Sequence, residues 1–375
     1  MRVRTQLAWC WCAVSLIVLS CTGPDGGGHD PTTTATPTTP TTATPPAPTT
    51  AAAAISPSTL RLVQERGTLK CGVNEGLTGF TNVDGDKVVG GFDPDFCGAI
   101  AAGVLGDKTR VDFVRLSTSN RFEALQSGAI DVLMRNTTRT SALDAQFDFG
   151  PTTYHDGQQL MGSSPPFRRD STISELNGSV VCVTKDTTTE ANLEEALGTV
   201  GVEAEIVPVE DSSQLGDGLD DGTCDVITAD GSALVSLREQ YRRDDAWVIF
   251  PTKPISREPL GPVYRSNDSQ WADIVNWTIF ATVIADEKGI DSNNVADKLV
   301  DPPDSEAALL LGGPNGLAAQ LGLDPAAFYT VISQVGNYDE IFQNNLGPVG
   351  ITRAGSLNAS VDELGLIIAP PIRAP

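Results

Sequence analysis

Residues 111–140, VDFVRLSTSNRFEALQSGAIDVLMRNTTRT, decide the fold class. Two short apolar runs, at 110–116 and 130–134, have the composition of buried strands, and 120–128 between them has the spacing of a short helix. A strand–helix–strand unit of this length predicts neighbouring parallel strands in one sheet. The second strand ends at MRNTTRT, and open α/β sheets bind ligands beyond the carboxyl ends of their strands. One stretch therefore predicts both a fold class and a binding loop.

The same alternation continues on both sides of this stretch. Towards the N-terminus, 68–73 is strand-like and 91–106 is helix-like, with Asp93 as the expected N-cap. A second series follows, at 179–184, 188–198, 204–209, 212–222, 224–230, 231–242 and 247–250. Two series predict two lobes, each an open, mainly parallel sheet flanked by helices. The C-terminal third is helix-rich, with amphipathic segments at 269–289 and 324–347.

The N-terminal residues have the pattern of an export signal and a tether. Arg2 and Arg4 precede an apolar run at 7–19, which is shorter than the ~20 residues that a transmembrane helix needs, so 1–20 is predicted to be a signal peptide. VLSC, ending at Cys21, is similar to the lipobox of bacterial lipoproteins. The alternative is an ordinary cleaved signal with a spare thiol. The Thr- and Pro-rich segment 21–57 predicts a flexible tether on the outer face of the cytoplasmic membrane.

The cysteines beyond the tether predict disulfide bonds. Cys71, Cys97, Cys182 and Cys224 form an even set in an exported domain, which indicates two bridges. Three pairings are possible, and Cys71–Cys97 with Cys182–Cys224 is favoured because each bridge then stays within one half of the chain. The spacing of these cysteines matches no zinc motif.

Charge and motif content exclude several function classes. The formal net charge is −23, with 25 basic and 48 acidic residues, which argues against a nucleic-acid partner. The only histidines are His29 and His155, so histidine-based zinc sites are excluded. No glycine-rich nucleotide motif follows a strand. We therefore expect no metal, no cofactor and no catalytic residues.

Small polar residues at strand ends are the remaining candidates for a site. They are Asn74, Glu75 and Thr78 after the first strand, Arg135 to Thr140, Lys185 to Glu190, and Asp230. Arginine offers a fork for a carboxylate, the N–H groups that open a helix near TTTE hold an anionic or polar group, and an aspartate accepts from an ammonium. Together these residue types predict a zwitterionic ligand, an amino acid.

Several ordered motifs carry a family resemblance. The segments CGVNEGLTGF, GGFDPDFCGAIAAGV, RFEALQSGAIDVLMRNTT, TYHDGQQLMG, TTTEANL, GTCDVITAD, SREPLGPV and QVGNYDEIF resemble the general L-amino-acid substrate-binding proteins of ABC transporters, in solute-binding family 3. The resemblance runs from about Gly67 to Arg373. It implies a type II periplasmic-binding-protein fold with lobe 1 at 58–154 and 259–375, lobe 2 at 155–258, and two hinge crossovers. It also implies a monomer that delivers its ligand to an ABC permease.

The resemblance assigns roles to some residues and leaves one role open. Its ammonium-binding aspartate falls on Asp230 and its carboxylate-binding threonine on Thr138. Its carboxylate-binding arginine, however, falls on Leu143. Arg139 and Lys185 are candidate replacements. The expected ligand-binding set is Asn74, Glu75, Thr78, Asn136, Thr138, Arg139, Lys185, Thr187, Thr188, Thr189 and Asp230.

Two other functions remain open from the sequence. One is an exported, dehydratase-like enzyme on the same fold, for which Glu75 is the one unusual ionisable group in a suitable loop. The other is a ligand-sensing lipoprotein that has no role in transport.

Overall fold

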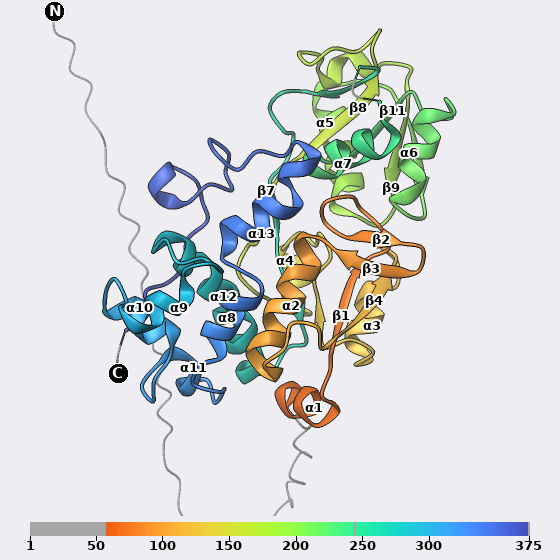
Figure 1. Ribbon diagram of the computed structural model, residues 1–375. Helices are drawn as coiled ribbons and strands as arrows, with labels where there is room; N and C mark the ends of the chain where they lie inside the picture. The colour runs from red at the N-terminus through yellow and green to blue at the C-terminus, as the bar shows by residue number, and fades with distance from the viewer. Residues whose placement is uncertain (1–57, 244, 374–375) are drawn as a thin grey trace, which may run out of the picture. The chain divides into compact units, whose positions relative to one another are not determined.

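The computed structural model of the protein describes residues 58–243 and 245–373 (Figure 1). The predicted signal peptide, Cys21 and the tether lie outside these described residues. Two five-stranded sheets form the framework, and each defines a lobe. The predicted two-lobed α/β fold is therefore confirmed.

The first lobe is built on a sheet with the strand order β4-β1-β5-β14-β6. One strand, β14, runs antiparallel to its neighbours β5 and β6, while β1 is parallel to both β4 and β5. The strand bounds are β1 Leu69–Asn74, β4 Val111–Leu116, β5 Val132–Leu133, β6 Asp148–Phe149 and β14 Val263–Tyr264, with a hairpin of β2 Asn82–Asp84 and β3 Lys87–Gly90.

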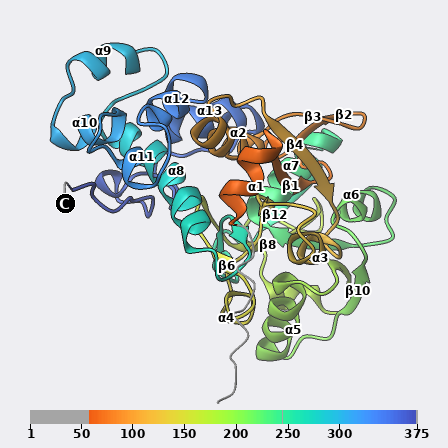
Figure 2. The same cartoon turned by 90° about the horizontal axis from the view of Figure 1, so that it is seen from below.

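The helices of the first lobe come from both ends of the described chain. Helix α12 packs on α2 and α8, and α13 packs on α8, so the C-terminal helices extend the core of this lobe. In Figure 2, α9, α10 and α12 lie on the side away from α5 and α6. The bounds are α1 Thr59–Arg66, α2 Phe92–Leu105, α3 Arg121–Gln126, α4 Ser141–Asp144, α8 Ser269–Glu287, α9 Val295–Val300, α10 Ser305–Leu311, α11 Leu317–Gln320, α12 Ala327–Gln334 and α13 Tyr338–Asn345, with short 3₁₀ turns η2 Gly347–Val349 and η3 Val361–Glu363.

The second lobe repeats the plan with the strand order β10-β9-β11-β8-β12. Here β8 is the antiparallel strand, and β9 is parallel to both β10 and β11. The bounds are β8 Gln158–Ser163, β9 Val180–Thr184, β10 Glu205–Val209, β11 Val226–Asp230 and β12 Trp247–Phe250, with η1 Ile173–Leu176, α5 Thr188–Val200, α6 Ser213–Asp220 and α7 Gly231–Tyr241. Each sheet is thus mainly parallel, as predicted, with one strand reversed.

Two helix boundaries differ from the sequence-based expectation. Helix α2 begins at Phe92 with Gly91 as its N-cap, so Asp93 lies inside the first turn. Gly91 has φ 134°, and a Cβ there would lie 2.4 Å from the carbonyl oxygen of Phe80, so only glycine fits. The segment 324–347 forms two helices rather than one, because Gly336 has φ 105° and Asn337 caps α13.

Two antiparallel strands connect the lobes. They are β7 Tyr154–Asp156 and β13 Glu258–Leu260, with Glu258 opposite Asp156. The C-terminal segment supports this pair, because the Asn358 side chain accepts from the His155 N–H at 2.6 Å and donates to the His155 carbonyl at 3.0 Å. The ring of Tyr154 also stacks on Phe342. The hinge is therefore braced by the C-terminal part of the chain.

Each lobe contains one disulfide bond. Cys71 in β1 is joined to Cys97 in α2, and Cys182 in β9 is joined to Cys224 just before β11. These are the pairs that the sequence favoured. Neither bridge crosses between the lobes, so both are compatible with relative motion of the two sheets. Within the described ranges, no helix has the length and apolar character that a membrane span requires.

Candidate functional site

A cavity of about 460 Å³ lies between the two lobes, at the carboxyl ends of β1, β5, β9 and β11. Strand ends from both sheets meet here, as expected for open α/β sheets. Several of the residues expected in the site line it: Asn74, Asn136, Thr138, Thr187, Thr188, Thr189 and Asp230.

A buried carboxyl group, that of Asp93, holds the loop that follows β5. Asp93, which is 4% exposed, accepts a hydrogen bond from the backbone N–H of Asn136. Asn136 itself has φ 35°, a left-handed conformation that is uncommon outside glycine. Burial raises the pKa of Asp93 to about 7, although the Asn136 hydrogen bond and the charge of Arg135 oppose this rise. The first turn of α2 thus fixes the shape of a cavity-lining loop.

Arg135 braces the cavity wall. Its Nε donates to the Leu116 carbonyl at 2.8 Å and its Nη2 donates to Thr118 Oγ1 at 3.1 Å. The same Nη2 lies 4.0 Å from Asp211 Oδ2 in the second lobe, and the Thr118 N–H also donates to that oxygen, at 3.2 Å. Arg135 and Thr118 therefore connect the lobes directly.

Arg139 and Lys185, the two candidate replacements for the missing arginine, are not among the residues that line the cavity. Arg139 makes a two-point contact with Asp144 on α4, with both N–O distances at 3.1 Å, and its side chain is 50% exposed. Lys185 donates to Glu210 at 2.8 Å on the surface. Each of these two cations forms an ion pair with a carboxylate of its own lobe. Glu75 and Thr78 are also not among the cavity-lining residues.

Arg121 lines the cavity beside Arg135, and it is not among the residues that the sequence predicts for the site. It is the first residue of α3, and its guanidinium carbon lies 4.8 Å from the centre of the Phe122 ring. Its buried Nε has no hydrogen-bond partner among the described residues. The pKa of Arg121 is lowered to about 9, mainly by burial and also by the charge of Arg135, while Asp230 and Asp211 oppose the shift. The guanidinium is therefore desolvated, and one of its donors, the buried Nε–H, has no partner.

Carboxyl groups gather next to the hinge, where Asp230 lines the cavity. Burial raises the pKa of Asp230 well above its usual value, and the neighbouring Asp156 and Glu258 raise it further. The carboxyl of Asp156 accepts from the Ser232 hydroxyl and from the Gly157 N–H, and burial raises its pKa to about 6. Within the described residues, the Asp230 carboxyl has no hydrogen-bond donor. It is thus the acidic group available to a cation.

The hydroxyl groups of Thr187 and Thr189, at the start of α5, already donate hydrogen bonds within the protein. Thr187 caps the helix by accepting from the Glu190 N–H, and its own hydroxyl donates to the Thr184 carbonyl at 2.6 Å. Because a hydroxyl has a single proton, Thr189, whose oxygen lies 2.7 Å from Thr187 Oγ1, is the donor in that pair. This wall of the cavity therefore presents acceptor oxygens.

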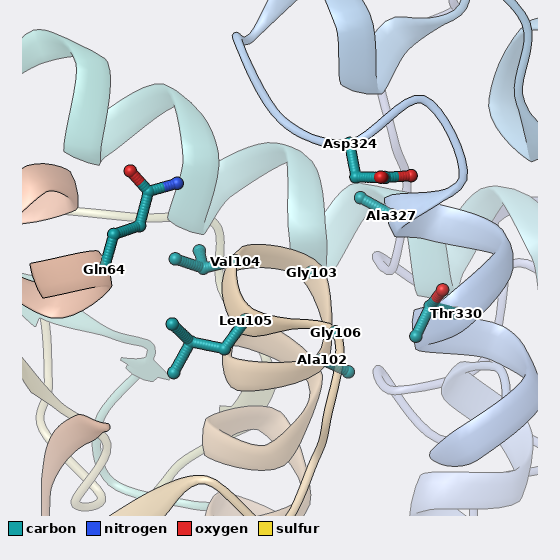
Figure 3. Close-up of a pocket in the computed structure, with 9 residues that line it drawn as sticks. All are labelled: Gln64, Ala102, Gly103, Val104, Leu105, Gly106, Asp324, Ala327 and Thr330. Carbon is teal, nitrogen blue, oxygen red and sulfur yellow. The ribbon is translucent and has the colours of Figure 1, made fainter. Parts of the chain in front are cut away.

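A second cavity, of about 490 Å³, lies at the C-terminal end of α2 (Figure 3). Its polar side chains are Gln64 on one side of the helix end and Asp324 and Thr330 on the other. It brings no pair of opposite charges together. Across residues 58–243 and 245–373, no cluster of three or more His, Cys, Asp or Glu side chains is placed to hold a metal ion. The interlobe cavity is therefore the candidate binding site.

Two open sheets joined by two crossover strands, with a charged cavity between their strand ends, define a two-lobed solute-binding protein. The chain belongs to the bacterial extracellular solute-binding proteins, family 3, whose family model matches residues 69–287. The protein is therefore an exported binding protein.

Known relatives match nearly the full folded part of the chain. The general L-amino acid-binding periplasmic protein AapJ of Rhizobium johnstonii is 42% identical over 332 residues, covering 86% of this chain and 95% of the relative. The glutamate/glutamine/aspartate/asparagine-binding protein BztA of Rhodobacter capsulatus is 40% identical over 325 residues, with 86% and 95% covered.

A solved structure is similar over the same region. An ABC transporter periplasmic binding protein from Brucella ovis, with glutathione bound, is 38% identical and has a TM-score of 0.80, covering 85% of this chain and 100% of that chain. These relatives are named as binding proteins and not as enzymes.

Proposed function

We propose that this protein captures an amino acid, or a molecule with an amino-acid end, in the interlobe cavity and delivers it to an ABC permease. The observation that carries the proposal is the placement of a desolvated cation, Arg121, and an unpartnered carboxyl, Asp230, in one cavity. The α-carboxylate of the ligand pairs with Arg121 and its ammonium pairs with Asp230. Leu143, which stands where the family arginine is expected, then contributes only apolar contact.

Closure of the lobes completes the site. In the proposed division, 58–154 and 259–375 form one lobe, 155–258 forms the other, and β7 and β13 bend between them. Arg121 belongs to the first lobe and Asp230 to the second, so a ligand contacts both charges only when the lobes are together. This arrangement couples ligand capture to a change of shape that a permease recognises.

The ligand range extends beyond the smallest amino acids. The relatives are named for general L-amino acids and for glutamate, glutamine, aspartate and asparagine, and the Brucella relative holds glutathione. The γ-glutamyl end of glutathione carries the same ammonium and α-carboxylate pair. The cavity volume of about 460 Å³ is within the roughly 300–1,000 Å³ typical of small-molecule sites.

A ligand screen tests this function. The purified protein is melted with each of the twenty proteinogenic amino acids and with glutathione, and the ligands that raise its melting temperature are titrated by calorimetry. A ligand at 100 times its dissociation constant adds about 2.7 kcal/mol to the free energy of unfolding. N-acetylated amino acids, which lack the ammonium, are the matched controls and are expected to give no shift. Absence of a shift with every unmodified compound would contradict the proposal.

Anchoring forms the second part of the proposal. Cys21 carries the lipid, and 21–57 holds the lobes away from the membrane as a monomeric receptor. Mass spectrometry of the mature N-terminus tests this, with Cys21→Ala as the comparison. A lipidated cysteine in the native protein and release of the variant from the membrane fraction are expected. An unmodified N-terminus beyond Cys21 would exclude the anchor.

A further inference from the structure

Glu258 joins cavity-lining residues of both lobes although it lies in the hinge. It is the first residue of β13 and is 2% exposed. Its Oε2 accepts from Thr138 Oγ1 at 2.6 Å and from Thr188 Oγ1 at 3.2 Å. Its Oε1 accepts from Asn192 Nδ2 at 2.9 Å and from Ser256 Oγ at 2.5 Å. Thr138 comes from the first lobe and Thr188 from the second, and both line the cavity.

The surroundings of Glu258 make its carboxylate an acceptor only. Four donor groups converge on its two oxygens, and within the described parts of the chain no lysine or arginine forms an ion pair with it. A carboxylate has enough lone pairs to accept all four bonds, whereas a hydroxyl has one proton. The protons of Thr138 and Thr188 therefore point towards Glu258, and only oxygen lone pairs remain to face the cavity.

This direction of hydrogen bonding determines which ligand group fits. A threonine oxygen whose proton is already donated binds an N–H or O–H group, and it repels a carboxylate oxygen. Thr187 and Thr189 next to it are oriented in the same way by the Thr184 carbonyl. With the Asp230 carboxyl, these groups form a surface of acceptors at the hinge end of the cavity.

We propose that Glu258 is a positioning residue that holds Thr138 and Thr188 as acceptors and so makes this end of the cavity select the ammonium of the ligand. The proposal rests on the amino-acid function proposed above and extends it to a residue that does not contact the ligand. It also reverses the role that the resemblance implied for Thr138, because a hydroxyl that donates to Glu258 has no proton left for a carboxylate.

Ligand discrimination separates this role from a purely structural one. Glu258 also ties the two lobes together, so its loss is expected to weaken binding generally. A structural defect reduces the affinity for all ligands by a similar factor. A defect in hydroxyl orientation reduces the affinity for an amino acid more than that for its 2-hydroxy analogue, in which a neutral hydroxyl replaces the ammonium. The ratio of the two dissociation constants is therefore the informative quantity.

The test uses Glu258→Gln in the full chain with two probe pairs, L-glutamate with (S)-2-hydroxyglutarate and L-leucine with (S)-2-hydroxy-4-methylpentanoate. The amide keeps the shape of the side chain but replaces one acceptor oxygen by a donor. Calorimetry is expected to show the preference for the amino acid falling by about tenfold or more, since sites built to bond a polar group discriminate strongly against its replacement. Glu340→Gln is the matched control, because Glu340 also accepts from a serine hydroxyl but lies outside the cavity lining.

Each outcome decides one question. If the wild-type protein binds neither probe amino acid, the best-binding amino acid of the ligand screen and its 2-hydroxy analogue replace them. If no compound of the screen binds, the amino-acid function fails and this proposal fails with it. If the wild-type protein binds one and Glu258→Gln weakens both members of the pair equally, or neither, the function stands and the positioning role is overturned. Should Glu258→Gln not fold, Thr188→Val and Thr188→Ser decide instead. Valine, which lacks the acceptor, is expected to reduce the preference and serine to keep it, and an unchanged preference in both variants overturns the proposal.

Discussion

The two walls of the cavity differ in the hydrogen bonds that they offer. The first lobe contributes the guanidinium of Arg121, which has a donor without a partner. The second lobe contributes the carboxyl of Asp230 and the acceptor oxygens at the start of α5. A ligand with a carboxylate at one end and an ammonium at the other matches this difference. Neither wall alone provides both charges, so affinity depends on closure of the lobes.

Removing the negative charge of Asp230 in the second lobe is expected to have the largest effect on ligand binding. Asp230→Asn keeps the size of the side chain but removes its charge, and disrupting a desolvated charge pair costs about 2–5 kcal/mol, which corresponds to roughly 30- to 5,000-fold weaker binding. Calorimetry with the best amino-acid ligand measures this. Asp170→Asn, on the surface of the same lobe, is the control and is expected to bind normally. Equal affinity in the two variants would remove Asp230 from the site.

The disulfide bonds allow the stability of the two lobes to be compared. Their sequence separations are 26 and 42 residues, so the chain-entropy relation gives about 3.5 kcal/mol for Cys71–Cys97 and about 4 kcal/mol for Cys182–Cys224. Replacing each pair by serines is expected to lower the free energy of unfolding by these amounts in urea titrations. The ligand dissociation constant should remain unchanged, because neither bridge lines the cavity. A loss of affinity would show that a bridge also shapes the site.

In the first lobe, substitutions of two arginines distinguish the proposed ligand contact, Arg121, from a surface residue, Arg139. Arg121→Ala is expected to weaken binding by about 1.5–3 kcal/mol, the contribution of a charge-assisted hydrogen bond. Arg139→Ala removes a half-exposed ion pair with Asp144, which contributes at most about 1 kcal/mol to stability and nothing to the ligand. Calorimetry on both variants makes the comparison. A larger loss of affinity in Arg139→Ala would restore it as the replacement for the family arginine.

The loop of the first wall should respond to pH through Asp93. Its folded-state pKa, about 7, lies above the unfolded value, so the carboxyl stabilises the fold at low pH and loses this effect as pH rises towards 7. Between pH 5 and pH 7 the loss amounts to about 2 kcal/mol of the free energy of unfolding. Urea titrations of the ligand-free protein at both pH values should show this decrease, and Asp93→Asn should reduce it. An identical decrease in the variant would mean that other groups cause it.

The fold was predictable because its signals are local. The apolar runs of β1, β4 and β9 and the helix patterns between them are read within a few residues, and parallel pairing follows from their alternation. Helix boundaries that depend on backbone contacts far away in the sequence were less predictable. Asp93 fits the pattern of an N-cap, but the helix begins at Phe92, after a Gly91 that lies close to the carbonyl of Phe80.

Site residues at the ends of strands were predictable from the sequence. Roles that depend on hydrogen-bond partners far away in the sequence were not. The sequence indicates Thr138, Thr188 and Asp230 because they lie at or just after the carboxyl ends of buried strands. It could not show that Glu258, 120 residues beyond Thr138, accepts the hydrogen bond that this hydroxyl donates. Arg121 opens a helix whose sequence does not indicate a ligand contact, and its place after the end of β4 is the one signal for its role.

The contact of Asp211 with Thr118 and Arg135 has a kinetic consequence. These groups join the lobes directly, without the ligand between them. We expect a trapped molecule to leave only after this contact has broken, whatever its chemical identity. Exit rates of different ligands should then share an upper limit set by the opening of the protein itself, and substitutions at Asp211 should alter how long a ligand stays.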